Sequence, residues 1–349
     1  MKRLNQEKLD NIVSGLSKRK YIHGAVIHLE SKDRSQSLFS ATGNLTPEST
    51  YYIASINKLV LSLITFRFHQ SGQLDINDKI SKFLSNEDLN KLLIIKREDF
   101  TSLLSIRHLM SHTSGLPCYL IDKRHDGKKN MDLILSGNDQ AWPIKKVIAE
   151  VKKMKPKFKP GTPGKAAYSE TNFRLLGKIL EVISQKSLHE LLTDLFIELK
   201  MDQTFVLPTK SYQSCAPVYF KENNIELKNY WSSTLHDIAS TAADQMKFLR
   251  AFFDGNYLDQ KILSEELQQW NNIFFPFKYG VGLQKFYMPR IFSPFKAIPD
   301  FVGHCGSVGS VAFYIPDKEL YITGTVNQAA NPNIVFQTMV KLINKIWIL

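Results

Sequence analysis

The sequence predicts a mixed α/β (α+β) protein in which both chain ends build one sheet and a large, mostly helical segment is inserted between them. Strand-like patterns open the chain and return only near its end, whereas helical periodicity dominates the middle. The 349 residues are 43% apolar and 22% charged, which is sufficient for a large buried core. We expect one catalytic unit over residues 1–349, with an α/β lobe (1–73 plus 275–349) and a helical lobe (74–274).

Local signals place the individual elements. Two strands at 24–30 and 37–42 flank the polar turn 31–35, and a helix over 55–70 ends at Ser71-Gly72. Further helices are expected at 144–153, 171–184, 188–199, 242–253 and from Asn333 to the chain end. The later strands are expected at 279–287, 310–315 and 320–326.

The chain is basic, with a formal net charge of +12. Lysines and arginines gather within 123–129 and 152–159. We favour solvated loops and helix faces as the explanation. The alternative is a basic rim that attracts anionic substrates or membranes. No recognised nucleic-acid-binding motif accompanies the charge, so no nucleic acid partner is expected.

Few features of the sequence indicate in which cellular compartment the protein lies. The three cysteines, Cys118, Cys215 and Cys305, match neither a disulfide framework nor a CxxC metal site. Residues 1–20 carry scattered charge without an apolar signal-peptide core, and the longest apolar runs are about eight residues, too short to span a bilayer. A cytoplasmic location is the simplest expectation; export by a route that needs no N-terminal signal stays open.

Ser55 and Lys58 form the most informative pair of residues. If Ser55 opens a helix, positions i and i+3 share one face, and the lysine amine can take the serine proton. Two other Ser-x-x-Lys strings begin at Ser17 and Ser293, but only Ser55 precedes a long apolar stretch. The pair therefore predicts a serine nucleophile with a neighbouring base.

Two further segments supply the other groups that such a nucleophile needs. Tyr168 follows a Pro/Gly-rich approach at 160–164 and enters a helix. It could shuttle protons with Lys58 if a nearby cation lowers its pKa, or it could be a partly buried aromatic at a helix entrance. The glycine-rich stretch 303–310 could pair the Ser307 N–H with the Ser55 N–H as an oxyanion hole, with His304 lining the cleft. A tight β-turn with an incidental histidine is the alternative.

Together these segments resemble the serine β-lactamase and penicillin-binding-protein superfamily, and most of all its class C β-lactamase-like esterases and D-amino-acid peptidases. The motif set is Ser55-x-x-Lys58, Tyr168-x-Glu170 and His304-x-Gly306. Connecting segments at 72–75, 106–117, 240–244 and 279–282 are also similar, so the resemblance covers about residues 24–328.

The resemblance implies a β-lactamase/transpeptidase-like antiparallel sheet flanked by helices. It also implies a mechanism without a metal or organic cofactor. Lys58 and Tyr168 would deprotonate Ser55, and the backbone N–H groups of Ser55 and Ser307 would hold the oxyanion. His304, Gly306 and Glu170 would complete the substrate-binding site. The substrate would be a small molecule or peptide with a carbonyl electrophile, with an anionic one as an option.

Two departures from the family pattern argue against an efficient β-lactamase. Glu170 replaces the usual asparagine, and a carboxylate cannot donate a hydrogen bond as an amide does. It could pair with Lys58 instead, or orient a cationic substrate. His304 replaces the lysine of true β-lactamases, and a neutral histidine would bind a β-lactam carboxylate less well. We expect a serine hydrolase that cleaves an ester or amide through a Ser55 acyl-enzyme.

Several alternatives remain open at this point. They are a β-lactamase, a D,D-carboxypeptidase, an acyltransferase and a non-catalytic binding protein on the same fold. The chain has no Gly-x-Ser-x-Gly elbow, and His108 and His112 lack the His-Glu-x-x-His pattern of zinc peptidases. Sequence indicates neither the physiological substrate nor the oligomeric state.

Overall fold

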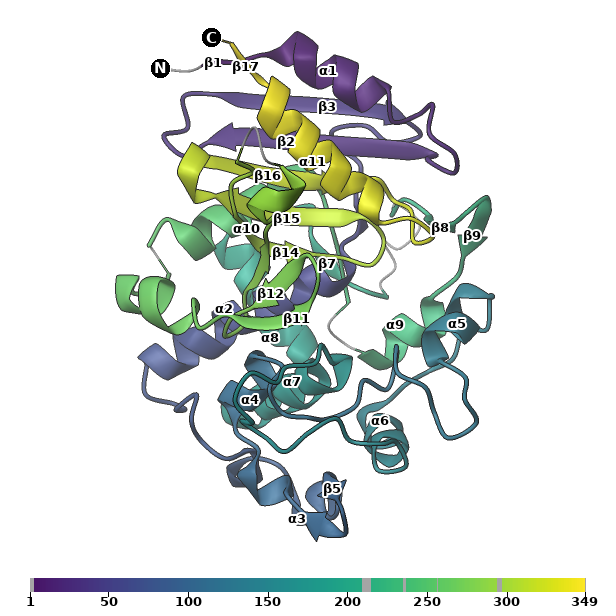
Figure 1. Ribbon diagram of the computed structural model, residues 1–349, viewed down its shortest axis with the longest axis vertical. Helices are drawn as coiled ribbons and strands as arrows, with labels where there is room; N and C mark the ends of the chain where they lie inside the picture. Colours follow the sequence, from purple (N-terminus) through teal and green to yellow (C-terminus); the bar gives the residue numbers. More distant parts are fainter. Residues whose placement is uncertain (1–2, 209–214, 235–236, 256, 294–296, 349) are drawn as a thin grey trace.

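A single large antiparallel sheet organises the molecule. The computed structural model describes residues 3–208, 215–234, 237–255, 257–293 and 297–348 (Figure 1). The strands of the sheet are β2 (Gly24–Ser31), β3 (Ser37–Gly43), β11 (Asn271–Phe274), β12 (Phe277–Tyr279), β13 (Gln284–Phe286), β14 (Phe301–Cys305), β15 (Ser310–Ile315) and β16 (Leu320–Thr325). Their spatial order is β11-β12-β13-β14-β15-β16-β2-β3.

The two chain ends meet inside this sheet. Strand β16 pairs with β2 in a register that places Leu320 opposite Ser31 and Thr325 opposite Val26. This junction lies inside the sheet rather than at an edge, and the side chains of β16 are buried throughout. The expected fold class, one sheet from both ends with a helical insertion, is confirmed.

The predicted strand at 279–287 is wrong, because the chain makes a hairpin there. β12 and β13 pair antiparallel around a turn at residues 280–283. Gly282 has a φ of +78°, and a Cβ atom there would lie 2.3 Å from the Ser62 Oγ. The alternating pattern is thus interrupted by a turn that only glycine fits comfortably.

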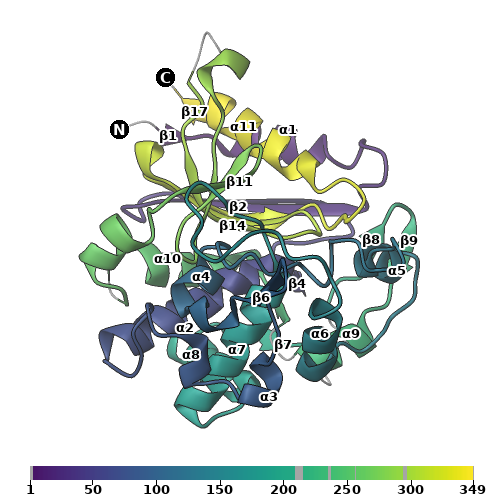
Figure 2. The same ribbon diagram turned by 60° about the horizontal axis from the view of Figure 1, so that its bottom comes forward.

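Helices cover both faces of the sheet (Figure 2). On one face, α1 (Gln6–Ser14) and α11 (Asn333–Lys345) bury an apolar cluster that includes Leu9, Val335 and Met339. On the other face, α10 (Ala242–Phe253) packs against β2, β15 and β16. α10 begins at its predicted position because the Thr241 hydroxyl caps the Asp244 N–H at 3.1 Å.

Most of the remaining elements form the lower half in Figure 1. The predicted helices at 144–153, 171–184 and 188–199 are present within two residues of their predicted ends. The helices are α2 (Asn57–Gln70), α3 (Asn86–Leu89), α4 (Ile106–Met110), α5 (Asn130–Leu135), α6 (Ile144–Val151), α7 (Glu170–Ser184), α8 (Leu188–Glu198) and α9 (Lys228–Thr234). Short strands are β4 (Tyr51–Tyr52), β5 (Ile94–Ile95), β6 (Glu98–Asp99), β7 (Phe205–Val206), β8 (Val218–Phe220), β9 (Asn223–Ile225) and β10 (Ile238–Ser240). The division into lobes 1–73 plus 275–349 and 74–274 stays a prediction.

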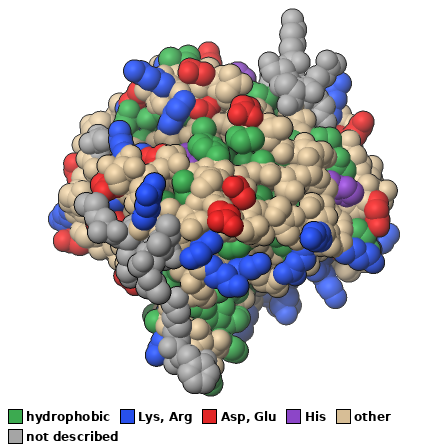
Figure 3. Space-filling view, turned by 90° about the horizontal axis from the view of Figure 1, so that it is seen from above, with side chains coloured by type: hydrophobic (Ala, Val, Ile, Leu, Met, Phe, Trp, Pro, Cys, Tyr) green, Lys and Arg blue, Asp and Glu red, His purple; other side chains and the backbone are tan. Residues whose placement is uncertain are grey.

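The chain termini also pair. The helix predicted from Asn333 to the chain end stops at Lys345, and β17 (Trp347–Ile348) then pairs with β1 (Arg3–Leu4). α11 is amphipathic and packs its apolar face on the sheet. Within the described ranges, no helix is both long and apolar enough to cross a membrane. On the face in Figure 3, lysine and arginine side chains gather along one edge, in line with the net charge of +12.

Candidate active site

Ser55 lies where a strained turn meets a buried helix. It belongs to a short 3-10 helix (Ala54–Ile56) that leads directly into α2. Ala54 has a φ of +48°, a left-handed conformation that a residue with a Cβ atom rarely adopts. Two long-range hydrogen bonds hold the turn, from the Ile53 N–H to Ile238 O and from the Ser310 hydroxyl to Ile53 O. The tertiary structure thus fixes the orientation of Ser55.

Lys58 is fully buried below Ser55. Its Nζ donates to the Ser55 Oγ at 3.1 Å and to the Glu170 Oε2 at 2.5 Å. α2 is buried from Asn57 to Phe66, so the Lys58 amine is held inside the protein rather than at its surface. A buried charge of this kind needs a close partner, and Glu170 is an acidic one. The structure therefore shows the Lys58–Glu170 pair that the sequence left as one of two options.

Tyr168 approaches Ser55 from the other side. Its hydroxyl donates to the Ser55 Oγ at 2.9 Å, and its ring packs on His112 with 4.6 Å between ring centroids. Burial, reinforced by the negative charge of Glu170, raises the pKa of Tyr168 well above its usual value of about 10. The condition set for a proton shuttle through a lowered Tyr168 pKa is therefore not met. Tyr168 stays a neutral phenol and a hydrogen-bond donor.

The family-like segment 106–117 positions Tyr168 and Glu170. His112 O accepts from the Ala167 N–H at 2.9 Å, and the His112 Nδ1 accepts from the Ser169 N–H at 3.2 Å. Pro117 O accepts from the hydroxyls of Ser169 and Thr171. The chain on both sides of Tyr168 is thereby tied to one turn. His112 has this structural role, and over the described ranges no cluster of three or more His, Cys, Asp or Glu side chains could hold a metal ion.

The glycine-rich stretch forms the turn between β14 and β15. The Gly306 N–H bonds to Ser310 O at 2.9 Å, and Gly306 packs against the turn that carries Ser55. A Cβ atom at Gly306 would lie 2.5 Å from Ile53 O and 3.0 Å from the Ala54 Cβ. This close approach places Ser307 on the wall of the same cavity as Ser55. The oxyanion role of the two backbone N–H groups stays a prediction.

We expect Gly306→Ala to lower the rate of Ser55 acylation by about 10²–10³-fold, the usual effect of losing an oxyanion donor. The added methyl group would push the turn, and with it the Ser307 N–H, away from Ser55. Stopped-flow or single-turnover kinetics with an activated ester measures this rate.

Ser307→Ala is the matched control for that variant, because it keeps the backbone N–H and should acylate at nearly the wild-type rate. An unchanged rate in Gly306→Ala, or an equal loss in both variants, would contradict the assignment.

His304 lies deeper than expected. Its side chain is 1% exposed, its Nδ1 donates to Cys305 O at 2.8 Å, and its Nε2 accepts from the Tyr279 hydroxyl at 3.0 Å. Burial, with the Lys58 charge, lowers the pKa of His304 to about 3. A neutral, buried imidazole with both nitrogens engaged is placed to support Tyr279. Its role as a substrate-binding residue stays a prediction.

Buried neutral histidines make the fold sensitive to acid. Burial also lowers the pKa of His28 to about 4, whereas histidine in an unfolded chain titrates near 6.5. Above that pH, His28 and His304 are neutral in both the folded and the unfolded chain. Below it, they bind protons in the unfolded chain but stay neutral in the folded protein. We expect the free energy of unfolding in urea to fall from about pH 6.5 towards pH 4, by up to about 1.4 kcal/mol per pH unit for each histidine.

Two variants separate the effect of histidine protonation on stability from the effect of carboxylate protonation. His304→Asn should flatten the acid dependence, whereas replacing exposed His189 by Asn should leave it unchanged. The same slope in His304→Asn and in wild type would contradict the prediction.

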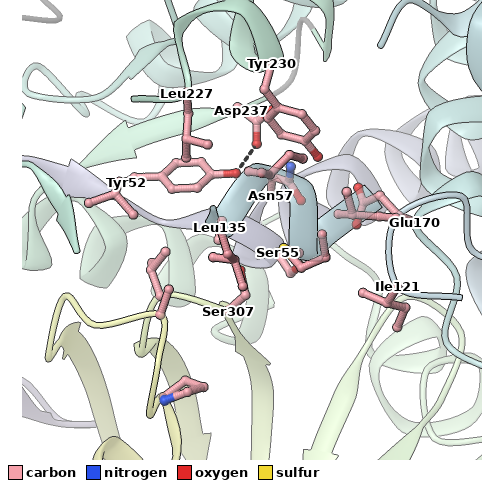
Figure 4. A pocket seen from close by; sticks show the side chains of 18 of the residues that line it. Tyr52, Ser55, Asn57, Ile121, Leu135, Glu170, Leu227, Tyr230, Asp237 and Ser307 are labelled. Carbon is pink, nitrogen blue, oxygen red and sulfur yellow. Dashed lines mark hydrogen bonds between the residues drawn. The ribbon is translucent and has the colours of Figure 1, made fainter. Parts of the chain in front are cut away.

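A cavity of about 300 Å³ opens above Ser55 (Figure 4). Lys58, Glu170 and Asp237 are the charged residues that line it. The Tyr52 hydroxyl donates to Asp237 at 2.5 Å, as the dashed line in Figure 4 marks. Most of the wall is apolar, formed by Leu120, Ile121, Met131, Ile134, Leu135, Val218, Ile225 and Leu227. The sequence did not predict these aliphatic residues, or Tyr52 and Asp237, as part of the site, because they come from separate segments without a shared motif.

The structure thus unites Ser55, Lys58, Tyr168, Glu170 and Ser307 around one cavity. Of the rival Ser-x-x-Lys strings, Ser17 bonds to Ser14 O at the surface, and the string from Ser293 ends at Lys296, which lies outside the described residues.

Comparison with known proteins gives a consistent result. The Beta-lactamase family model matches residues 9–338. Protein flp of Staphylococcus aureus (strain MW2) is 24% identical over 57% of this chain and 38% of its own length. The teichoic acid D-alanine hydrolase of S. aureus (strain MRSA252) is 23% identical over 68% of this chain and 54% of its own. The chain therefore spans about half the length, or less, of the curated relatives it matches.

Solved structures support the fold. A D-amino acid amidase from Ochrobactrum anthropi SV3 aligns with a TM-score of 0.78 at 21% identity, over 96% of this chain and 99% of its own. A D-stereospecific amidohydrolase from Streptomyces sp. aligns with a TM-score of 0.76 at 20% identity, over 97% and 98%. At these identities the likeness establishes the architecture, and it agrees with the predicted β-lactamase/transpeptidase-like fold.

Proposed function

The chain belongs to the β-lactamase family, and from this premise we propose that it is a serine hydrolase that cleaves an ester or amide through a Ser55 acyl-enzyme. One observation carries the proposal: the Ser55 Oγ is within hydrogen-bond distance of both the Lys58 Nζ, at 3.1 Å, and the Tyr168 hydroxyl, at 2.9 Å. A nucleophile, a base and a proton donor within hydrogen-bond reach are what acyl transfer requires.

The proton path follows these contacts. The 2.5 Å contact allows a proton to pass from the Lys58 ammonium to the Glu170 carboxylate, which leaves a neutral amine. That amine takes the Ser55 proton as the Oγ attacks the carbonyl carbon. Tyr168 then gives its phenolic proton to the leaving group and is reprotonated from Lys58. Because the pKa of Tyr168 is raised, this residue acts as a relay through its neutral form rather than as a phenolate base.

The cavity favours an apolar acyl group. Aliphatic side chains form most of its wall, and apolar walls bind hydrocarbon by removing it from water. Glu170, held by Lys58, offers no amide donor to the amide-bearing side chain of a penicillin. We therefore place simple acyl esters and amides ahead of β-lactams as substrates. D-Amino acid amides, on which the solved structural neighbours are named to act, are a second probe class.

Intact-protein mass spectrometry after exposure to a fluorophosphonate tests the proposal. Wild type should gain one adduct, and Ser55→Ala should gain none while remaining folded by circular dichroism. No adduct on well-folded wild type would overturn the proposal in favour of a non-catalytic binder. Parallel exposure to a penicillin should give little adduct. Product analysis with an added alcohol or amine separates hydrolysis from acyl transfer.

The cytoplasmic location suggested by residues 1–20 belongs to the proposal as well. Cell fractionation followed by immunodetection would test it.

A further inference from the structure

Three large apolar side chains are exposed together at one end of the sheet. The exposed fractions are 57% for Phe275, 82% for Ile291 and 64% for Phe292. Phe275 follows β11, whereas Ile291 and Phe292 belong to a short 3-10 helix (Arg290–Phe292) between β13 and β14. The rings of Phe275 and Phe292 lie 5.3 Å apart by centroid, so residues distant in sequence form one cluster. We call Phe275, Ile291 and Phe292 the aromatic patch.

The stretch of chain that carries the aromatic patch is basic. The sequence from Leu267 to Pro299 contains no aspartate or glutamate. Arg290 is exposed beside Ile291, and the Lys278 Nζ lies 4.7 Å above the ring of Tyr287, which itself contacts Phe275. Apolar side chains therefore lie next to cations without acidic residues among them in this stretch.

An exposed aromatic side chain that adjoins the aromatic patch in sequence contacts the active site. Phe274, the neighbour of Phe275, is 51% exposed, and its ring contacts that of Tyr168 at 6.4 Å between centroids. Tyr168 in turn donates to Ser55. In Figure 2 the light-green segment that carries Arg290–Phe292 projects beyond the sheet above β11.

From these observations we infer that the aromatic patch inserts into the interface of an anionic lipid membrane, with Arg290 and Lys278 against the headgroups. Exposed aromatic and aliphatic side chains beside cations are the combination that binds such interfaces. The inference concerns where the protein binds and does not depend on its catalytic activity.

A second copy of the chain fits this surface less well. Three side chains fall far short of the roughly 1,200–2,000 Å² that a stable protein interface buries. Facing copies would also oppose cations on both sides, which destabilises contact. An anionic lipid surface supplies both a hydrocarbon phase for the rings and a complementary charge.

Vesicle co-sedimentation tests the inference with the full chain. Wild type should bind vesicles of phosphatidylcholine and phosphatidylglycerol, bind less at high salt because charges are screened, and bind poorly to phosphatidylcholine alone. Phe275→Ser/Ile291→Ser/Phe292→Ser should weaken binding by about tenfold or more. Arg290→Glu/Lys278→Glu should remove most of the salt-sensitive part of vesicle binding.

Matched controls lie on the helical half. Val182→Ser/Ile197→Ser replaces apolar side chains of comparable exposure, 44% and 70%, and should bind vesicles as wild type does. Fluorophosphonate labelling of Ser55 in solution should be unchanged in the triple variant, so failure of binding is separable from failure of catalysis.

Absence of wild-type binding to anionic vesicles, or equal binding by the triple variant, would overturn the inference. If light scattering showed a dimer for wild type and a monomer for the triple variant, the inference would be overturned in favour of a second copy of the chain as the partner.

Discussion

Lys58→Met is expected to lower the free energy of unfolding by about 3–5 kcal/mol and to slow Ser55 acylation by about 10³-fold or more. Methionine matches the length and apolar character of the lysine stem but leaves the Glu170 carboxylate buried without its 2.5 Å partner. The side chains of Lys58 and Glu170 are 1% and 8% exposed, so water cannot replace that partner. Urea denaturation and single-turnover kinetics with an activated ester measure the two effects.

The double variant Lys58→Met/Glu170→Gln separates stability from catalysis. Replacing the Glu170 carboxylate as well should recover most of the lost stability, because replacing both members of a buried ion pair is far less costly than removing one. Acylation should not recover, since no base remains beside Ser55. Recovery of both properties would assign the pair a purely structural role, and recovery of neither would show that packing around α2 had failed.

Tyr168→Phe should slow acylation by an unactivated alkyl ester by about 10²–10⁴-fold. The change removes one hydroxyl and leaves the ring in contact with His112 and Tyr279. The loss of a single hydrogen bond should cost about 0.5–1.5 kcal/mol of stability. A p-nitrophenyl ester should lose much less rate than the alkyl ester, because its leaving group needs no proton. Steady-state and single-turnover kinetics with the ester pair would measure this.

Tyr230→Phe is the matched control for the Tyr168 variant. Tyr230 lines the same cavity, and its hydroxyl contacts that of Tyr119 at 3.4 Å rather than Ser55. This variant should retain nearly the wild-type rate with both esters. If Tyr168→Phe lost the same factor with both esters, Tyr168 would orient Ser55 without transferring a proton.

The local pattern was sufficient for most of the fold. Helix α10 begins where predicted because its start depends on the capping residue Thr241, a signal contained within a few residues. The hairpin at β12 and β13 was missed because its turn is set by the close approach of Gly282 to Ser62, which lies far away in sequence. The short C-terminal strand β17 was missed because its partner is β1, at the opposite end of the chain.

For the candidate site, the sequence supplied the chemical groups but not their states. The order of Ser55, Lys58, Tyr168 and His304 could be read directly, because the chemistry of each side chain and the spacing within each motif are local properties. Their protonation was not readable from the sequence: burial and the charge of Glu170 together raise the pKa of Tyr168, whereas the proton shuttle considered from the sequence required a lowered one. His304 was expected to line the cleft, yet it is 1% exposed.

By itself, the sequence determined the fold class, the family and the residues that can act at Ser55. Only the tertiary structure decided that Glu170 pairs with Lys58, that Tyr168 remains neutral, that the cavity wall is aliphatic and that Phe275 joins Phe292 at the surface. Helix periodicity, capping and motif spacing act over a few residues. Desolvation, ion pairing and cavity shape arise only when segments more than a hundred residues apart, such as those carrying Lys58 and Glu170, are brought into contact.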